Sequence, residues 1–137
     1  MIEIGQILYF VPPYFADGQM NNTKRIMLVV EVDTKDNVLT LVNLSKIYDK
    51  NPRIFLFTHN LRLKHNTPFS VATFAKLDGA YKVELFNGID KYLYGVKPHK
   101  LNSTDIQLII NERTKQLQSG NVREVFIDKH DFMKSNT

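Results

Sequence analysis

The chain has 137 residues, of which 43% are hydrophobic and 23% charged, and it contains no cysteine. This length fits a single domain, residues 1–137, that can bury a core, and the lack of cysteine excludes disulfides and thiolate metal sites. The formal net charge of +4 permits a nucleic-acid partner without requiring one. The longest apolar run, Ile26–Val30, is too short for a bilayer, and the first ten residues lack the pattern of a signal peptide. The sequence therefore predicts a cytoplasmic protein with no membrane contact.

Three strands are predicted in the first third of the chain. Gly5–Phe10 alternates side chains as a strand does, and two apolar runs, Ile26–Val32 and Val38–Leu44, flank the polar turn "DTKDN". The two runs predict a hairpin, and their nearly continuous apolar character is typical of strands covered on both faces. The connection before the hairpin, "VPPYFADGQMNNTK", is long for a compact domain, and such loops tend to be functional or disordered.

Further strands are predicted in the middle of the chain. "RIFLFT", Arg53–Thr58, is a fourth candidate strand. Phe69–Leu85 has strand character on both sides of Gly79, a position that suits a bulge or a sharp bend. Tyr92–Val96 is either a short strand or a loop.

One helix is predicted, at about 103–119. Asn102 is a good N-cap, Asp105 stands near the positive end of the helix dipole, and Gly120 is a natural residue after the last turn. The residues at helical spacing that predict its buried face are Ile106, Ile109, Ile110 and Leu117. After Gly120, "NVREVFIDKHDFM" predicts a short strand with a polar tail. The expected fold is mainly β (α+β), a small twisted antiparallel sheet or partly open barrel with one C-terminal helix on a face or edge.

Sequence motifs exclude several kinds of chemistry. No phosphate-binding glycine loop and no hydrolase nucleophile elbow occurs. The four histidines, His59, His65, His99 and His130, lack the spacing of metal ligands. We therefore predict no metal site and no cofactor.

The open end of the predicted hairpin carries cations and a hydroxyl. Lys24 and Arg25 enter its first strand, and Ser45 and Lys46 leave its second, so antiparallel pairing places them side by side. A guanidinium can donate to two oxygens of one phosphate, and a serine hydroxyl can donate to the same group. The alternative is a strand-end ion pair beside a solvated serine. The pattern alone leaves both open.

Four segments, in order, resemble the MazF/PemK-like toxins, which are bacterial endoribonucleases of toxin–antitoxin systems with an SH3-like barrel. These segments are "IEIGQILYF", "TKRIMLVVEV", "LTLVNLSKI" and "FAKLDGAYKVEL" with "LNSTDIQLII". Two positions depart from the family: Ile26 follows the arginine where the family has proline, and Ser45 replaces a threonine. Lys24 and the "LSK" ending are also similar to the ToxN-like branch, whose antitoxin is an RNA.

The resemblance implies a site and a reaction. It implies that Arg25 and Ser45 are catalytic, and that the loop Val11–Thr23 is mobile and borders an RNA groove. The implied reaction is metal-independent attack of an RNA 2′-hydroxyl on its own phosphate, which leaves a 2′,3′-cyclic phosphate and a 5′-hydroxyl. The other side chains expected to contact RNA are Lys24, Lys46, Arg53, Arg62, Lys64, Lys76, Tyr14 and Phe15.

The implied partners are single-stranded RNA, a protein or RNA antitoxin and a second copy of the chain, in a system carried on a mobile element. Two other functions stay open. One is a CcdB-like gyrase poison that acts by protein binding through the tail "EVFIDKHDFM". The other is a barrel that binds RNA without cleaving it, with Ile26 marking a decayed site.

Overall fold

The computed structural model describes residues 2–47, 59–65, 68–69, 71–95, 97 and 99–137. The predicted strand at 53–58 lies outside these residues, and so does Arg53, one of the expected RNA contacts. Among the described residues, no helix is both long enough and apolar enough to cross a membrane.

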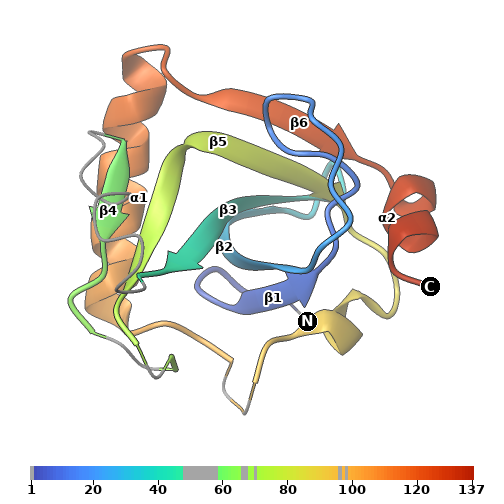
Figure 1. Ribbon diagram of the computed structural model, residues 1–137, viewed down its shortest axis with the longest axis horizontal. Helices are drawn as coiled ribbons and strands as arrows, with labels where there is room; N and C mark the ends of the chain where they lie inside the picture. Colours follow the sequence, from blue (N-terminus) through green and yellow to red (C-terminus); the bar gives the residue numbers. More distant parts are fainter. Residues whose placement is uncertain (1, 48–58, 66–67, 70, 96, 98) are drawn as a thin grey trace.

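One sheet of six strands organises the described part of the chain (Figure 1). Its antiparallel strands follow the order β1-β2-β3-β5-β4, and β6 adds in parallel to β5. The strands are β1 (Ile7–Phe10), β2 (Arg25–Asp33), β3 (Val38–Lys46), β4 (Asn60–Arg62), β5 (Thr73–Glu84) and β6 (Arg123–Ile127). The predicted first strand and hairpin are confirmed as β1 and as the β2–β3 pair.

Strand β5 bends where the sequence predicts it. Before the bend Lys76 pairs with Asn43, whereas after it Tyr81 pairs with Leu41, so β5 has more residues than β3 over this stretch. Gly79 lies inside the irregularity. The ribbon of β5 turns sharply along its length (Figure 1). The bend lets one strand pair with β4 at its start and with β6 at its end.

The described helices are α1 (Ser103–Gln118), α2 (Lys129–Ser135) and the short 3-10 helix η2 (Ile89–Tyr92). The predicted helix is confirmed as α1: the Asn102 side chain accepts a hydrogen bond from the Thr104 amide at 2.9 Å, and Gly120 has a φ of +71°. The segment predicted as a polar tail contains α2 instead, so α1 is not the only helix. The Asp128 carboxylate caps α2 by accepting from the Asp131 amide at 2.8 Å.

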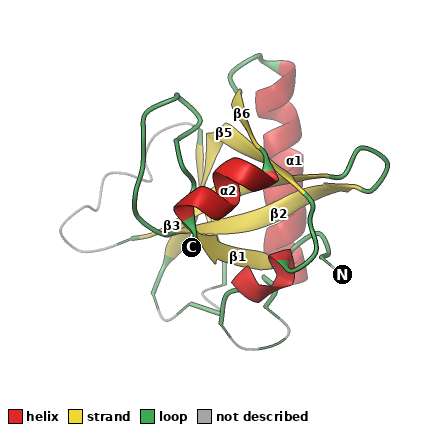
Figure 2. Ribbon diagram, turned by 90° about the vertical axis from the view of Figure 1, so that its right-hand side faces the viewer, coloured by secondary structure: helices red, strands yellow, loops and turns green. Residues whose placement is uncertain are grey.

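Both faces of the β2–β3 hairpin are covered, as predicted (Figure 2). Met27 and Leu41 point to a cluster that includes Phe132 of α2, while Leu28 and Val42 point to a cluster that includes Ile109 of α1. The expected buried face of α1 is confirmed in part, since Ile109 is fully buried and Ile106 packs against the same cluster. Leu117, however, is 43% exposed, and the polar Asp105 and Arg113 are buried instead.

The molecule is thus mainly β with helices on both sides of an open sheet. The edge strands β1, β4 and β6 do not pair with one another in the part of the chain that the structure describes.

Candidate functional site

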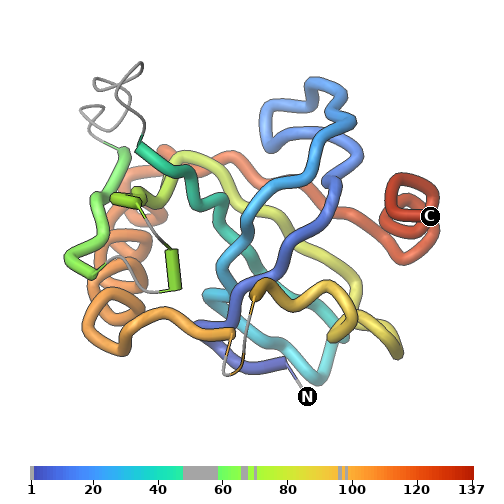
Figure 3. The backbone as a smooth tube through the Cα atoms, turned by 60° about the horizontal axis from the view of Figure 1, so that its bottom comes forward, coloured from blue at the N-terminus to red at the C-terminus, as the bar shows by residue number. Residues whose placement is uncertain are grey.

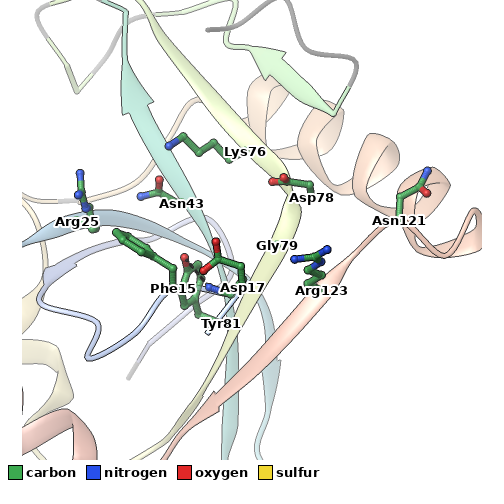
Figure 4. A pocket seen from close by; sticks show the side chains of 11 residues that line it. Phe15, Asp17, Arg25, Asn43, Lys76, Asp78, Gly79, Tyr81, Asn121 and Arg123 are labelled. Atoms are coloured by element: carbon green, nitrogen blue, oxygen red, sulfur yellow. Dashed lines mark hydrogen bonds between the residues drawn. The ribbon is translucent and has the colours of Figure 1, made fainter. Parts of the chain in front are cut away.

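A cleft of about 540 Å³ opens where the long connection after β1 faces the bend of β5 (Figure 4). Its walls come from that connection, the start of β2, the end of β3, β5 and the start of β6. The residues that line it are Phe15, Ala16, Asp17, Arg25, Asn43, Lys76, Asp78, Gly79, Tyr81, Asn121 and Arg123.

Three polar side chains from adjacent strands meet at one end of the cleft. Asn43 lies directly opposite Lys76 in the β3–β5 ladder, and on its other side it lies opposite Met27 in the β2–β3 ladder. Arg25 precedes Met27 by two residues and therefore shares its face of the sheet. Figure 4 shows the amide of Asn43 between the guanidinium of Arg25 and the side chain of Lys76.

Arg25 is held by an aromatic ring but lacks a hydrogen-bond partner at one nitrogen. Its guanidinium carbon lies 5.2 Å from the centre of the Phe15 ring. Its Nε is buried and makes no hydrogen bond. A buried donor left unsatisfied costs about 1–3 kcal/mol, so an acceptor that entered the cleft would relieve this cost.

The surroundings of Lys76 perturb the pKa of its ammonium group. Burial lowers the pKa of its ammonium from the ordinary 10.5, and the nearby Arg25 cation lowers it further, whereas Asp78 acts in the opposite direction. Two like charges held together in a partly buried cleft favour an anionic ligand, because a negative group between them offsets their repulsion.

The acidic and phenolic groups of the cleft have partners of their own. An Asp17 oxygen accepts from the Gln19 amide at 3.0 Å, and an Asp78 oxygen lies 3.4 Å from the His59 ring. The Tyr81 hydroxyl oxygen accepts from the Ala16 amide at 3.3 Å. Burial raises the pKa of Tyr81, so its hydroxyl stays protonated at neutral pH.

The connection between β1 and β2 forms one wall of the cleft as a small hairpin. Tyr14 and Met20 form a bridge across it, and its tip turns at Gly18, whose φ is +89°. The Tyr14 hydroxyl donates to the Phe126 carbonyl of β6 at 2.8 Å. Figure 3 shows this connection beside the C-terminal segment, which ties the wall to β6 and α2.

The wall packs directly against the bend of β5, with no space for an additional side-chain atom between them. A Cβ added at Gly79 would lie 2.7 Å from the Cβ of Ala16, closer than real Cβ atoms approach. Gly79 therefore does more than bend the strand. It lets the wall settle directly on the β5 backbone, beside Phe15 and Asp17.

The structure distributes the predicted site residues over several places. Arg25, Phe15 and Lys76 line the cleft. Ser45 pairs with Phe74 in the β3–β5 ladder and is not among the lining residues, so the cleft brings Arg25 together with Lys76 and not with Ser45. Tyr14 anchors the wall through its hydroxyl, which is the role expected of a loop anchor.

The other predicted RNA contacts that the structure describes are not among the residues lining the cleft. Lys24 points away from the Arg25 side, with its Nζ 5.3 Å from the Tyr9 ring. Lys46 pairs with Thr73 at the end of the β3–β5 ladder. Arg62 lies at the end of β4, and the Lys64 amide donates to Asp105 of α1 at 2.8 Å. Their contacts with RNA stay predictions.

Several residues of the cleft were not among the predicted site residues. Asn43 is one of them, and its position opposite Lys76 follows from the antiparallel pairing of β3 with β5. The residues that only the tertiary structure brings there are Asp17, Asp78, Tyr81, Asn121 and Arg123.

Within the described ranges, no group of three or more His, Asp or Glu side chains is placed to hold a metal ion. Comparison with protein-family models and with curated proteins finds no match for this sequence.

Proposed function

We propose that the cleft binds single-stranded RNA and cleaves it without a metal ion, leaving 2′,3′-cyclic phosphate and 5′-hydroxyl ends. The observation that carries the proposal is the placement of Arg25 and Lys76 on either side of Asn43 in an open cleft, with Arg25 Nε buried and unpartnered. These groups offer hydrogen-bond donors to one phosphodiester, and Arg25 also offers its positive charge.

The proposed reaction needs the RNA itself as nucleophile. The 2′-hydroxyl attacks the adjacent phosphorus, the bond from phosphorus to the 5′ oxygen breaks, and negative charge builds up on the non-bridging oxygens. Arg25 stabilises this charge through its planar set of donors. The Asn43 amide is held rigidly beside Arg25, because it already donates to the Ile26 carbonyl at 3.0 Å. Phe15 and Tyr81 supply ring surfaces for a neighbouring base.

The proposal extends to the biological setting that the sequence resemblance implies. The chain would act in the bacterial cytoplasm as a toxin, as a homodimer, with a protein or RNA antitoxin that blocks the cleft. The open sheet would be a variant of the PemK-like barrel, and the sharp bend of β5 supports this because it curls one sheet around two apolar clusters.

The test is incubation of the purified protein with end-labelled single-stranded RNA in excess EDTA, followed by identification of the fragment ends by mass. We expect cyclic-phosphate ends from the wild type and a loss of about 100-fold or more in rate for Arg25→Ala. Lys35→Ala removes one positive charge from the far turn of the hairpin and should cleave normally.

Two results would redirect the proposal. Intact RNA that stays tightly bound to the wild type would favour the RNA-binding alternative. Equal cleavage by wild type and Arg25→Ala would remove Arg25 from the site.

The protein-binding alternative cannot be tested by deleting residues 122–137, because Ile127 and Phe132 are fully buried in the core. Phe126→Ser is the suitable variant, since Phe126 is 52% exposed.

A further inference from the structure

We propose that Lys76, in its neutral form, accepts the proton of the attacking 2′-hydroxyl. The inference rests on the proposed ribonuclease function and assigns a role in it that Arg25 cannot fill, because a guanidinium stays protonated in proteins.

The position of Lys76 suits a group that exchanges protons with a substrate. It lies on β5 directly opposite Asn43, and its side chain extends across the cleft toward Asn43 and Arg25 (Figure 4). In the described part of the chain, no hydrogen bond or ion pair holds its Nζ. The amine therefore faces the same space in which Arg25 would hold the phosphate.

The other possible acceptors of the cleft are less suited to this step. The Tyr81 hydroxyl stays protonated because burial raises its pKa, and its oxygen already accepts from Ala16. The Asp17 carboxylate forms the turn of the wall through Gln19. Asp78 comes after Lys76, the residue that pairs with Asn43, and one of its oxygens lies beside the His59 ring.

Burial and the nearby Arg25 cation favour the neutral form of Lys76 in the free protein. Arg25 faces it from β2, and burial together with this cation lowers the pKa of the ammonium. Asp78 on β5 acts the other way. From β3 the facing side chain is the uncharged Asn43, and from β4 the register partner is the uncharged Asn60.

Charges on the remaining walls are balanced in number. Asp17 comes from the wall between β1 and β2, Arg123 comes from the start of β6, and the Tyr81 hydroxyl stays neutral at physiological pH. Among the described residues, His59, which lies beside Asp78, is a further titratable group near this end of β5.

The step balances without another reactant. Neutral Lys76 takes the 2′-hydroxyl proton and becomes an ammonium, while the 2′ oxygen forms its bond to phosphorus. The electron pair of the breaking bond goes to the 5′ oxygen, which takes a proton from water to become the 5′-hydroxyl. Lys76 then returns its proton to solvent. The RNA is rearranged and cut, with no oxidation or reduction.

The experiment is the pH dependence of kcat/KM for a single-stranded oligonucleotide, since kcat/KM reports the ionisations of the free enzyme. For the wild type we expect kcat/KM to rise with pH as Lys76 loses its proton, at a pH below the ordinary lysine value of 10.5. Lys76→Arg keeps the charge but cannot become neutral. It should lose this rise and at least about 100-fold of the rate, because general base catalysis contributes that much.

Three measurements separate this role from a structural one. Affinity of Lys76→Arg for a 2′-deoxy oligonucleotide, which cannot be cleaved, should stay within a few-fold of the wild type. Lys76→Ala should regain activity when small primary amines are added. Lys82→Arg, a matched change on the same strand where Lys82 pairs with Glu124 at 3.3 Å, should behave as wild type.

The outcomes distinguish the two proposals. A wild type that cleaves RNA, with Lys76→Arg retaining both the rise with pH and most of the rate, overturns the role of Lys76 and leaves the ribonuclease function standing. Absence of amine rescue in a folded Lys76→Ala protein overturns the role as well. A wild type that does not cleave RNA overturns both.

Discussion

The contact between Gly79 and Ala16 leads to a prediction that can be worked out in numbers. Gly79→Ala places a methyl group 2.7 Å from the Cβ of Ala16, where ordinary contacts begin near 3.4 Å. Forcing such a group into a packed contact costs about 1–3 kcal/mol. The φ of Gly79 lies outside the left-handed region, so alanine also gains about 0.4–1 kcal/mol by restricting the unfolded chain. The net expected loss in free energy of unfolding is about 1–2 kcal/mol.

Exchanging the two residues should reverse this loss. Ala16→Gly alone should cost about 0.4–1 kcal/mol, because it adds freedom to the unfolded chain. If the two changes acted independently, the double variant would lose about 1.5–3 kcal/mol in total. Since the methyl group that clashes is gone, we expect the double variant to lie within about 0.5 kcal/mol of the wild type. The coupling energy is then about 1.5–3 kcal/mol.

The assay is urea unfolding of the four proteins, analysed as a two-state transition. Affinity for a 2′-deoxy oligonucleotide, measured in parallel, should fall for Gly79→Ala and recover in the double variant, because the wall carries Phe15 to the side of Arg25. Additive losses in the double variant would refute the reasoning, since they would mean that the two residues do not press on each other.

Three further predictions concern polar side chains. Asp105→Ala should lower the free energy of unfolding by about 3–5 kcal/mol, because this buried carboxylate accepts two backbone amides that would lose their partner, and urea unfolding measures it. Tyr14→Phe should lower it by about 1 kcal/mol through loss of the hydrogen bond to β6, and an equal stability would show that water replaces the bond. Lys76→Met should raise stability at neutral pH, because the folded state lowers the pKa of Lys76 and so disfavours its charged form. This advantage should shrink as pH rises toward 10.5, and NMR titration of Lys76 should show its pKa rising in Arg25→Gln.

Local signals in the sequence predicted the elements that build the framework. Val38–Leu44 has the apolar character of a strand covered on both faces, and Asn102 marks the start of α1, because strand burial and helix capping depend on neighbouring residues. Gly79 predicted the bend for the same reason. The sequence predicts a polar tail where α2 lies, because a helix of seven residues with one fully buried ring, Phe132, is too short to show a helical spacing of apolar residues.

The candidate site was predicted only in part. Arg25 and Lys76 were each expected to contact RNA, but their meeting depends on the register of β3 against β5, which the irregularity at the bend shifts. Tyr81 lies past that bend, and Arg123 arrives by a parallel pairing between segments far apart in the chain. Such long-range pairings leave no local pattern in the sequence.

The tie between the two ends of the described chain has a consequence during synthesis. The Asn136 side chain donates to the Val11 carbonyl at 2.9 Å and accepts from the Val11 amide at 2.7 Å, and Phe126 holds the cleft wall through Tyr14. A nascent chain still attached to the ribosome lacks these partners until Asn136 has left the exit tunnel. The wall therefore gains its full set of contacts with the C-terminal segment only after residues 11–136 have all been synthesised.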